Sequence, residues 1–197
     1  MLIALTAFLV VFLAELPDKS MLVCLVLGTH YRAAWVWLGA AGAFLLHVGM
    51  AVTAGGLLST LPRPALLVLF VGGLVAGVVA LLRAGDAGAQ DEGAQEASEL
   101  ASAAPERRGL GVVGLSFGAV FVGEWGDVTQ IATANLAAGS TQPFAVGVGA
   151  LLALCSVVAI AVTVGSRVVS RLPVRVLRRA AALVLALVAV GAVAQAA

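Results

Sequence analysis

Long apolar runs separated by short polar segments make up most of this chain. A helix that crosses the hydrocarbon core of a bilayer needs about 20 apolar residues, and six runs approach or exceed that length. They extend over residues 2–28, 33–58, 65–82, 110–137, 143–165 and 174–195. A transmembrane β-barrel would instead show short segments of alternating polarity. The pattern therefore predicts an all-α integral membrane protein with six transmembrane helices.

Composition agrees with this class. Of the 197 residues, 62% are hydrophobic and only 11% are charged. The net charge of +1 gives no indication of a nucleic-acid partner. Cys24 and Cys155 are isolated in apolar runs, so they form neither a disulfide framework nor a metal-ligand spacing. We therefore expect no resident cofactor.

One polar segment, residues 84–108, interrupts the apolar pattern. It holds six of the ten acidic residues and has no hydrophobic face, as is typical of a flexible, solvated linker. The linker divides the chain into a first three-helix unit, residues 1–83, and a second, residues 109–197.

The two units repeat one another. The matching pairs are "ELPDKS" at 15–20 with "EWGDVT" at 124–129, Gly39-Ala40 with Gly149-Ala150, and Leu61-Pro62 with Leu172-Pro173, at offsets of 109, 110 and 111. Three matches in order indicate an internal repeat. Because three helices are an odd number, the second unit enters the membrane from the opposite side. The sequence thus predicts two inverted three-helix repeats, a design common among secondary transporters.

Basic residues in short loops predict the orientation, because such residues gather on the cytoplasmic side. With six crossings, nine of them share one side, and the other side has only Arg63. The nine are Arg32, Arg83, Arg107, Arg108, Arg167, Arg171, Arg175, Arg178 and Arg179. We therefore expect a cytoplasmic linker and two extracytoplasmic termini.

Two acidic pairs stand in the apolar runs. Glu15 and Glu124 fall near the middle of the first and fourth runs, and Asp18 and Asp127 follow at i+3, on the same face of each predicted helix. A carboxylate at the bilayer centre costs about 2.5–3.5 kcal/mol or more, so it is seldom kept without a function. If the two-fold axis brings these faces together, four carboxylates converge at the midplane.

Such a cluster can lower its free energy in two ways. It can bind a cation, or it can take up protons, because burial and like-charge repulsion disfavour the ionised carboxylates. Each excludes the other, which is the chemistry of a cation/proton antiporter. Oxygen ligands suit ions such as Ca²⁺ and Mn²⁺, and no Cys or His cluster indicates zinc or copper.

Residues beside the acids fit this role. Pro17 cannot donate a hydrogen bond to the carbonyl of Leu13, and Gly126 weakens the helix at the matching position. Helices broken at the midplane free carbonyl oxygens that can bind a cation.

Other polar side chains have two interpretations each. Ser20, Thr129 and Gln130 could supply neutral oxygens to the cation or make ordinary interhelical hydrogen bonds. Lys19 lies four residues beyond Glu15, and it either tunes the binding properties of the acids or merely balances their charge. His47, midway along the second run, either relays protons or is simply hydrogen-bonded.

The paired motif resembles that of a known family. Two copies of Glu-x-Gly-Asp-(Lys/Arg)-(Ser/Thr) in two three-helix repeats, separated by an acidic linker, resemble the Gdt-one family, to which the Golgi transmembrane protein 165 belongs. The resemblance implies Ca²⁺/Mn²⁺:proton exchange, and in a bacterial plasma (inner) membrane it implies manganese export. It assigns cation binding to Glu15 and Asp18 and to Glu124 and Asp127.

Both copies depart from the motif. Pro17 stands where the family has Gly, and Val128 stands where it usually has Lys or Arg. Only one lysine then balances the four acids. This difference affects the expected number of protons exchanged and the expected ion preference. Mn²⁺, Ca²⁺ and Mg²⁺ all stay open as substrates, as does a homo-oligomer.

Two alternative functions fit the sequence less well. A small-solute exporter of similar two-repeat architecture would not need four carboxylates. An intramembrane aspartyl protease would carry Gly-x-Gly-Asp, but Glu124 stands at the first Gly, and the first copy has no Gly. The absence of a nucleotide-binding loop argues against direct ATP drive. We therefore expect a transporter and not an enzyme.

Overall fold

The computed structural model describes residues 1–16, 18–62 and 107–164, together with scattered positions between 64 and 102 and between 182 and 190. The two longer parts contain α1 (Leu2–Glu15), α2 (Lys19–His30), α3 (Ala33–Leu58), α6 (Leu110–Gly123), α7 (Val128–Ala138) and α8 (Pro143–Val164). No strand occurs among the described residues. The all-α class is therefore confirmed.

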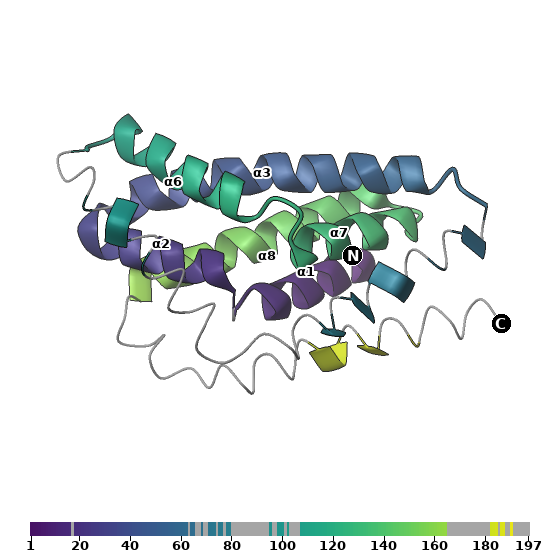
Figure 1. Ribbon diagram of the computed structural model, residues 1–197. Helices are drawn as coiled ribbons and strands as arrows, with labels where there is room; N and C mark the ends of the chain where they lie inside the picture. Colours follow the sequence, from purple (N-terminus) through teal and green to yellow (C-terminus); the bar gives the residue numbers. More distant parts are fainter. Residues whose placement is uncertain are drawn as a thin grey trace.

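The first and fourth apolar runs are each divided into two helices. α1 ends at Glu15 and α2 begins at Lys19, while α6 ends at Gly123 and α7 begins at Val128. The second and fifth runs each form one long helix, α3 and α8. The order short, short, long therefore occurs twice along the chain (Figure 1).

Helix length explains why the short helices work in pairs. By length and composition, α3 and residues 143–163 of α8 can cross a membrane, whereas α1, α2 and α6 are shorter apolar helices. The 14 residues of α1 rise only about 21 Å at 1.5 Å per residue, which is less than the hydrocarbon core of about 30 Å. A crossing by the first or fourth run therefore needs both helices of its pair.

Each pair of short helices packs mainly on the long helix of the other half. α1 and α2 lie against α8, and α6 and α7 lie against α3 (Figure 1). α3 and α8 also contact each other. The apolar core between them includes the fully buried side chains of Val11, Leu27, Val36, Ala150 and Val157. The two halves are thus interlocked around one core.

Two glycines mark equivalent helix crossings. A Cβ on Gly39 of α3 would overlap the carbonyl oxygen of Val113 in α6, and one on Gly149 of α8 would overlap that of Ala4 in α1. Gly39 and Gly149 are 110 residues apart, and Ala4 and Val113 are 109 apart. The same close contact is therefore made twice with the halves exchanged, in agreement with the repeat. The opposite membrane orientation of the halves stays a prediction.

Several sequence features lie outside the described residues. They are Pro17, Arg63, Arg83, Leu172-Pro173, the arginines between 167 and 179, half of the third apolar run and most of the sixth. Within the acidic linker, the described positions 95, 98–100 and 102 are helical. Glu, Gln and Leu, which are among these residues, are good helix formers. The flexibility of the linker as a whole stays a prediction.

The close crossing at Gly39 can be tested by adding one methyl group. Gly39→Ala should lower the free energy of unfolding by roughly 1–3 kcal/mol, because the new Cβ overlaps the α6 backbone. Gly49→Ala on the same helix is the control, since nothing lies within 4 Å of its Cβ position. Thermal unfolding of the purified protein in detergent measures both, and equal melting temperatures would contradict the crossing.

Candidate functional site

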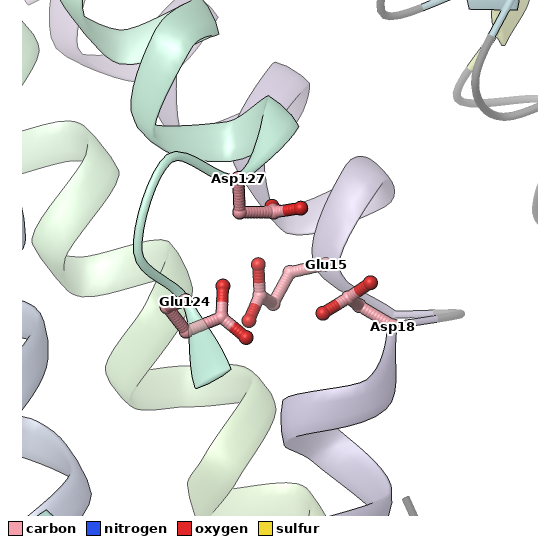
Figure 2. A group of neighbouring side chains, drawn as sticks. All are labelled: Glu15, Asp18, Glu124 and Asp127. Atoms are coloured by element: carbon pink, nitrogen blue, oxygen red, sulfur yellow. The ribbon is translucent and has the colours of Figure 1, made fainter. Parts of the chain in front are cut away.

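The two interrupted helices bring four carboxyl groups into one cluster. One carboxylate oxygen from each of Glu15, Asp18, Glu124 and Asp127 lies within 4.8 Å of the others. Figure 2 shows these side chains pointing toward one another across the gap between the α1–α2 and α6–α7 breaks. The sequence places the two motifs 109 residues apart, and the fold brings them together.

Each motif is built as a helix end, a turn and a helix start. Glu15 is the last residue of α1 and Glu124 is the C-cap of α6, while Asp18 and Asp127 are the N-caps of α2 and α7. The Asp18 N–H donates to the Glu15 carbonyl oxygen at 2.9 Å, and the Asp127 N–H donates to that of Glu124 at 3.2 Å. The expectation that each pair shares one helical face is therefore wrong, because a break separates the two acids.

The aspartates are fixed by capping hydrogen bonds. Oδ2 of Asp18 accepts from the Ser20 N–H at 3.4 Å, and Oδ2 of Asp127 accepts from the Thr129 N–H at 3.0 Å and from its hydroxyl at 3.1 Å. A helix start has unpaired N–H groups and favours negative charge. Each aspartate is thus held at the N-terminus of its helix. An acid directly after Pro17 or Gly126 was the available sequence signal for this capping role.

The glutamates are the most deeply buried members of the cluster. Glu15 is fully buried and Glu124 is 5% exposed. Oε1 of Glu15 accepts from the Ser20 hydroxyl at 2.5 Å, whereas its buried Oε2 has no hydrogen-bond partner among the described residues. A buried polar atom without a partner is costly. Oε2 of Glu15 therefore has capacity to accept a further hydrogen bond or a cation.

Electrostatic repulsion adds to this cost. Two carboxylates 4.8 Å apart repel by about 3–4 kcal/mol at an effective dielectric constant of about 20. With four such groups in contact, the fully ionised and empty cluster is strongly disfavoured. The arrangement can be neutralised by a cation or by protons on the carboxyl groups.

Gly126 shapes the break between α6 and α7. Its φ is +78°, in the left-handed region that favours glycine. Nothing lies within 4 Å of its Cβ position, so the backbone conformation, and not crowding, requires glycine here. The sequence indicated Gly126 only as a weak point of a helix.

Two of the supporting polar residues donate hydrogen bonds to the acids, and a third lines a cavity with one of them. The hydroxyls of Ser20 and Thr129 donate to Glu15 and Asp127, within the cluster. Lys19, the first residue of α2, lines a small cavity together with Glu124.

Gln130 is hydrogen-bonded to the second break and to α3. Its Oε1 accepts from the Gly126 N–H at 2.9 Å, and its Nε2 lies 3.1 Å from Nδ1 of His47. His47 is hydrogen-bonded through both ring nitrogens, since its Nε2 lies 3.1 Å from the carbonyl oxygen of Phe121. Both residues stand out as polar positions in the apolar runs of the sequence, but their contact has no sequence signal.

Comparison with known proteins identifies relatives across most of the chain. The family described as divalent cation/proton antiporter GDT1 matches residues 3–89 and 112–197. A GDT1-like protein of Synechocystis is 34% identical over 174 residues, which cover 81% of this chain and 82% of that protein.

Two further relatives are chloroplastic. Protein PAM71 of Arabidopsis thaliana is 32% identical over 186 residues, or 82% of this chain, and GDT1-like protein 2 of Oryza sativa is 30% identical over 167 residues, or 74%. This chain spans about half the length of each, 48% and 47%. No solved structure matches the chain.

The matched residues include both acidic motifs and all six helices named above, except for the first residue or two of α1 and α6. The family consists of membrane transporters and not of enzymes, so the protease alternative is excluded. The chain belongs to the GDT1 family of divalent cation/proton antiporters.

Proposed function

We propose that this chain exports Mn²⁺ or Ca²⁺ from the cytoplasm in exchange for protons, and that Glu15, Asp18, Glu124 and Asp127 bind the cation. The observation that carries this proposal is the cluster itself, four carboxyl groups with ligand oxygens within 4.8 Å of one another. The buried Oε2 of Glu15, which has no hydrogen-bond partner among the described residues, supports a role for this group in binding a cation. Family membership supplies the reaction class.

Exchange follows from competition for the same oxygens. A bound divalent cation cancels much of the repulsion among the carboxylates, and protons do the same when they replace it. The cluster without either is too costly to be well populated. The site therefore switches its access from one side of the membrane to the other only when it holds a cation or protons. Each transfer of a cation is thus coupled to proton movement in the opposite direction.

The size of the cluster bears on ion choice. Opposite ligands around Ca²⁺ are separated by about 4.6–5.2 Å, twice the Ca²⁺–oxygen distance of about 2.3–2.6 Å. Around Mg²⁺ the corresponding separation is only about 4.0–4.2 Å, and Mg²⁺ gives up its water reluctantly. The four ligand atoms lie within 4.8 Å of one another, a span that falls in the Ca²⁺ range, and this supports the proposal of an ion larger than Mg²⁺. The hydroxyls of Ser20 and Thr129 lie close enough to the acids to add neutral oxygens.

Alternating access follows from the repeat. If the two halves have opposite orientations, one motif enters from each side and the cluster lies on the axis between them. The exchanged contacts of Gly39 and Gly149 support this relation. We place the central linker in the cytoplasm and both termini outside a bacterial plasma membrane, where an inward proton gradient drives cation export.

Transport by the purified protein tests the proposal directly. In proteoliposomes with an internal pH dye, external Mn²⁺ or Ca²⁺ should make the interior more alkaline, because protons leave as the cation enters. Mg²⁺ should have a weaker effect. Protein-free liposomes are the control, and the proposal fails if none of the three ions moves protons.

Neutral variants of the acids test the site. Glu15→Gln and Asp127→Asn should each reduce exchange by about 100-fold or more while the protein still inserts, since each removes a charge that must alternate between cation and proton. Glu99→Gln, at an exposed acid of the linker, is the matched control. Wild-type exchange in both cluster variants would show that these acids have only a structural role.

A third variant tests the turn at Gly126. Gly126→Ala should weaken cation binding and destabilise the protein by about 1–2 kcal/mol, because a side chain is strained at a φ of +78°. Gly123→Ala is matched in space, since both Cβ positions are open, but lies in a helix. Titration of cation binding and thermal unfolding compare the two, and identical behaviour would show that the turn is not required.

A further inference from the structure

A chain of hydrogen bonds connects α3 to the break in the second motif. It runs from the Gly126 N–H to Oε1 of Gln130 at 2.9 Å, from Nε2 of Gln130 to Nδ1 of His47 at 3.1 Å, and from Nε2 of His47 to the carbonyl oxygen of Phe121 at 3.1 Å. Phe121 lies in the last turn of α6, Gly126 in the break, and Gln130 in the first turn of α7. We call this chain the α3 clasp.

The two ends of the clasp determine the proton positions within it. The Gly126 N–H can only donate, and the Phe121 carbonyl can only accept. Nε2 of His47 must therefore carry its proton, and Nδ1 must accept from the amide of Gln130. Every hydrogen bond then has one donor and one acceptor, with His47 as a neutral imidazole in one tautomer.

Packing supports the same arrangement. His47 is 4% exposed, and its ring centroid lies 4.9 Å from that of Phe121 and 6.0 Å from that of Trp125. His47 and Gln130 also line a small cavity together with Glu124. One side chain of α3 thus contacts the end of α6 and the turn, and reaches the start of α7 through Gln130.

The first motif has different residues at the matching positions. An offset of 109 pairs Gln130 with Met21, and an offset of 110 pairs His47 with Val157. Both are apolar and buried, with 1% and 0% of their surfaces exposed. The clasp therefore joins α3 of the first half to the second motif alone, the motif in which Val128 replaces the lysine of the first.

We propose that His47 and Gln130 are positioning residues that hold the α6–α7 break in the geometry that binds the cation, which rests on the proposed function of the cluster. Gly126 has no Cβ, and no atom lies within 4 Å of the position that a Cβ would take, so packing there does little to restrain its backbone. The clasp supplies that restraint from α3 and so fixes Glu124 relative to Asp127. His47 acts through Gln130 and the backbone, and neither binds the cation nor carries its protons.

Two variants remove the clasp from its two sides. His47→Phe keeps an aromatic ring but no hydrogen bond, and Gln130→Met introduces the residue of the first motif. Each should raise the KM for Mn²⁺ or Ca²⁺ by about fivefold or more, with kcat within about twofold, because buried partners lose their hydrogen bonds. The double variant should be no worse than the worse single variant, since both residues act in one chain.

A rescue and a control complete the transport assay. His47→Asn places an oxygen near the position of Nδ1 and cannot titrate, so it should restore most of the cation affinity. Trp37→Phe removes a similar ring N–H bond, 3.0 Å long, to the Cys155 carbonyl oxygen. It lies ten residues, about 15 Å, along α3 and should leave KM unchanged. Loss of turnover in both His47→Asn and His47→Phe would instead make His47 a proton relay and overturn the proposal.

Hydrogen–deuterium exchange gives a readout that does not depend on transport. In detergent, the peptide containing residues 124–127 should exchange faster in His47→Phe and Gln130→Met, but not in Trp37→Phe. If both clasp variants keep the wild-type rate of hydrogen–deuterium exchange and the wild-type KM, the positioning role of the clasp is overturned. The antiporter proposal then stays intact. A wild-type protein that moves no protons would overturn the antiporter proposal, whereas the exchange data would still decide whether the clasp holds the break.

Discussion

Repulsion among four carboxyl groups in one buried cluster is the constraint on which the rest of the molecule depends. Glu15 and Glu124 are buried, and the four ligand atoms lie within 4.8 Å of one another. Such a cluster is tolerated only if its charge is compensated. The starts of α2 and α7 compensate part of it, because Asp18 and Asp127 accept hydrogen bonds from backbone N–H groups there. In the proposed mechanism, a cation or protons compensate the remainder, which is why the two exchange.

Helix interruption connects this chemistry to the fold. An uninterrupted helix would use the N–H groups near Asp18 and Asp127 for its own backbone hydrogen bonds, and neither aspartate could act as a cap. The breaks release those groups at the cluster. They also leave helices too short to cross a bilayer alone, so each pair is supported along its length by α3 or α8 of the other half. The site and the interlocked packing therefore depend on each other.

The two halves share a scaffold but differ beside the cluster. The Gly39 and Gly149 crossings and the paired caps repeat closely. Lys19 has Val128 as its counterpart, and the clasp residues have apolar counterparts. In the proposed antiporter, an asymmetric pair of motifs gives the two faces of the site different rigidity and charge.

The sequence by itself determined the helical class, the extents of α3 and α8, and the four acids of the cluster, because long apolar runs and intramembrane carboxylates are strong local signals. It also indicated the repeat, through short matches such as Gly39-Ala40 with Gly149-Ala150. Pro17 and Gly126 indicated a weak point in each motif, but the structure showed that Asp18 and Asp127 are helix caps and do not share a helical face with the glutamates. Only the tertiary structure decided that the two motifs meet and that His47 reaches Gln130, because these contacts join chain segments 109 and 83 residues apart. Periodicity along a single helix carries no information about such contacts.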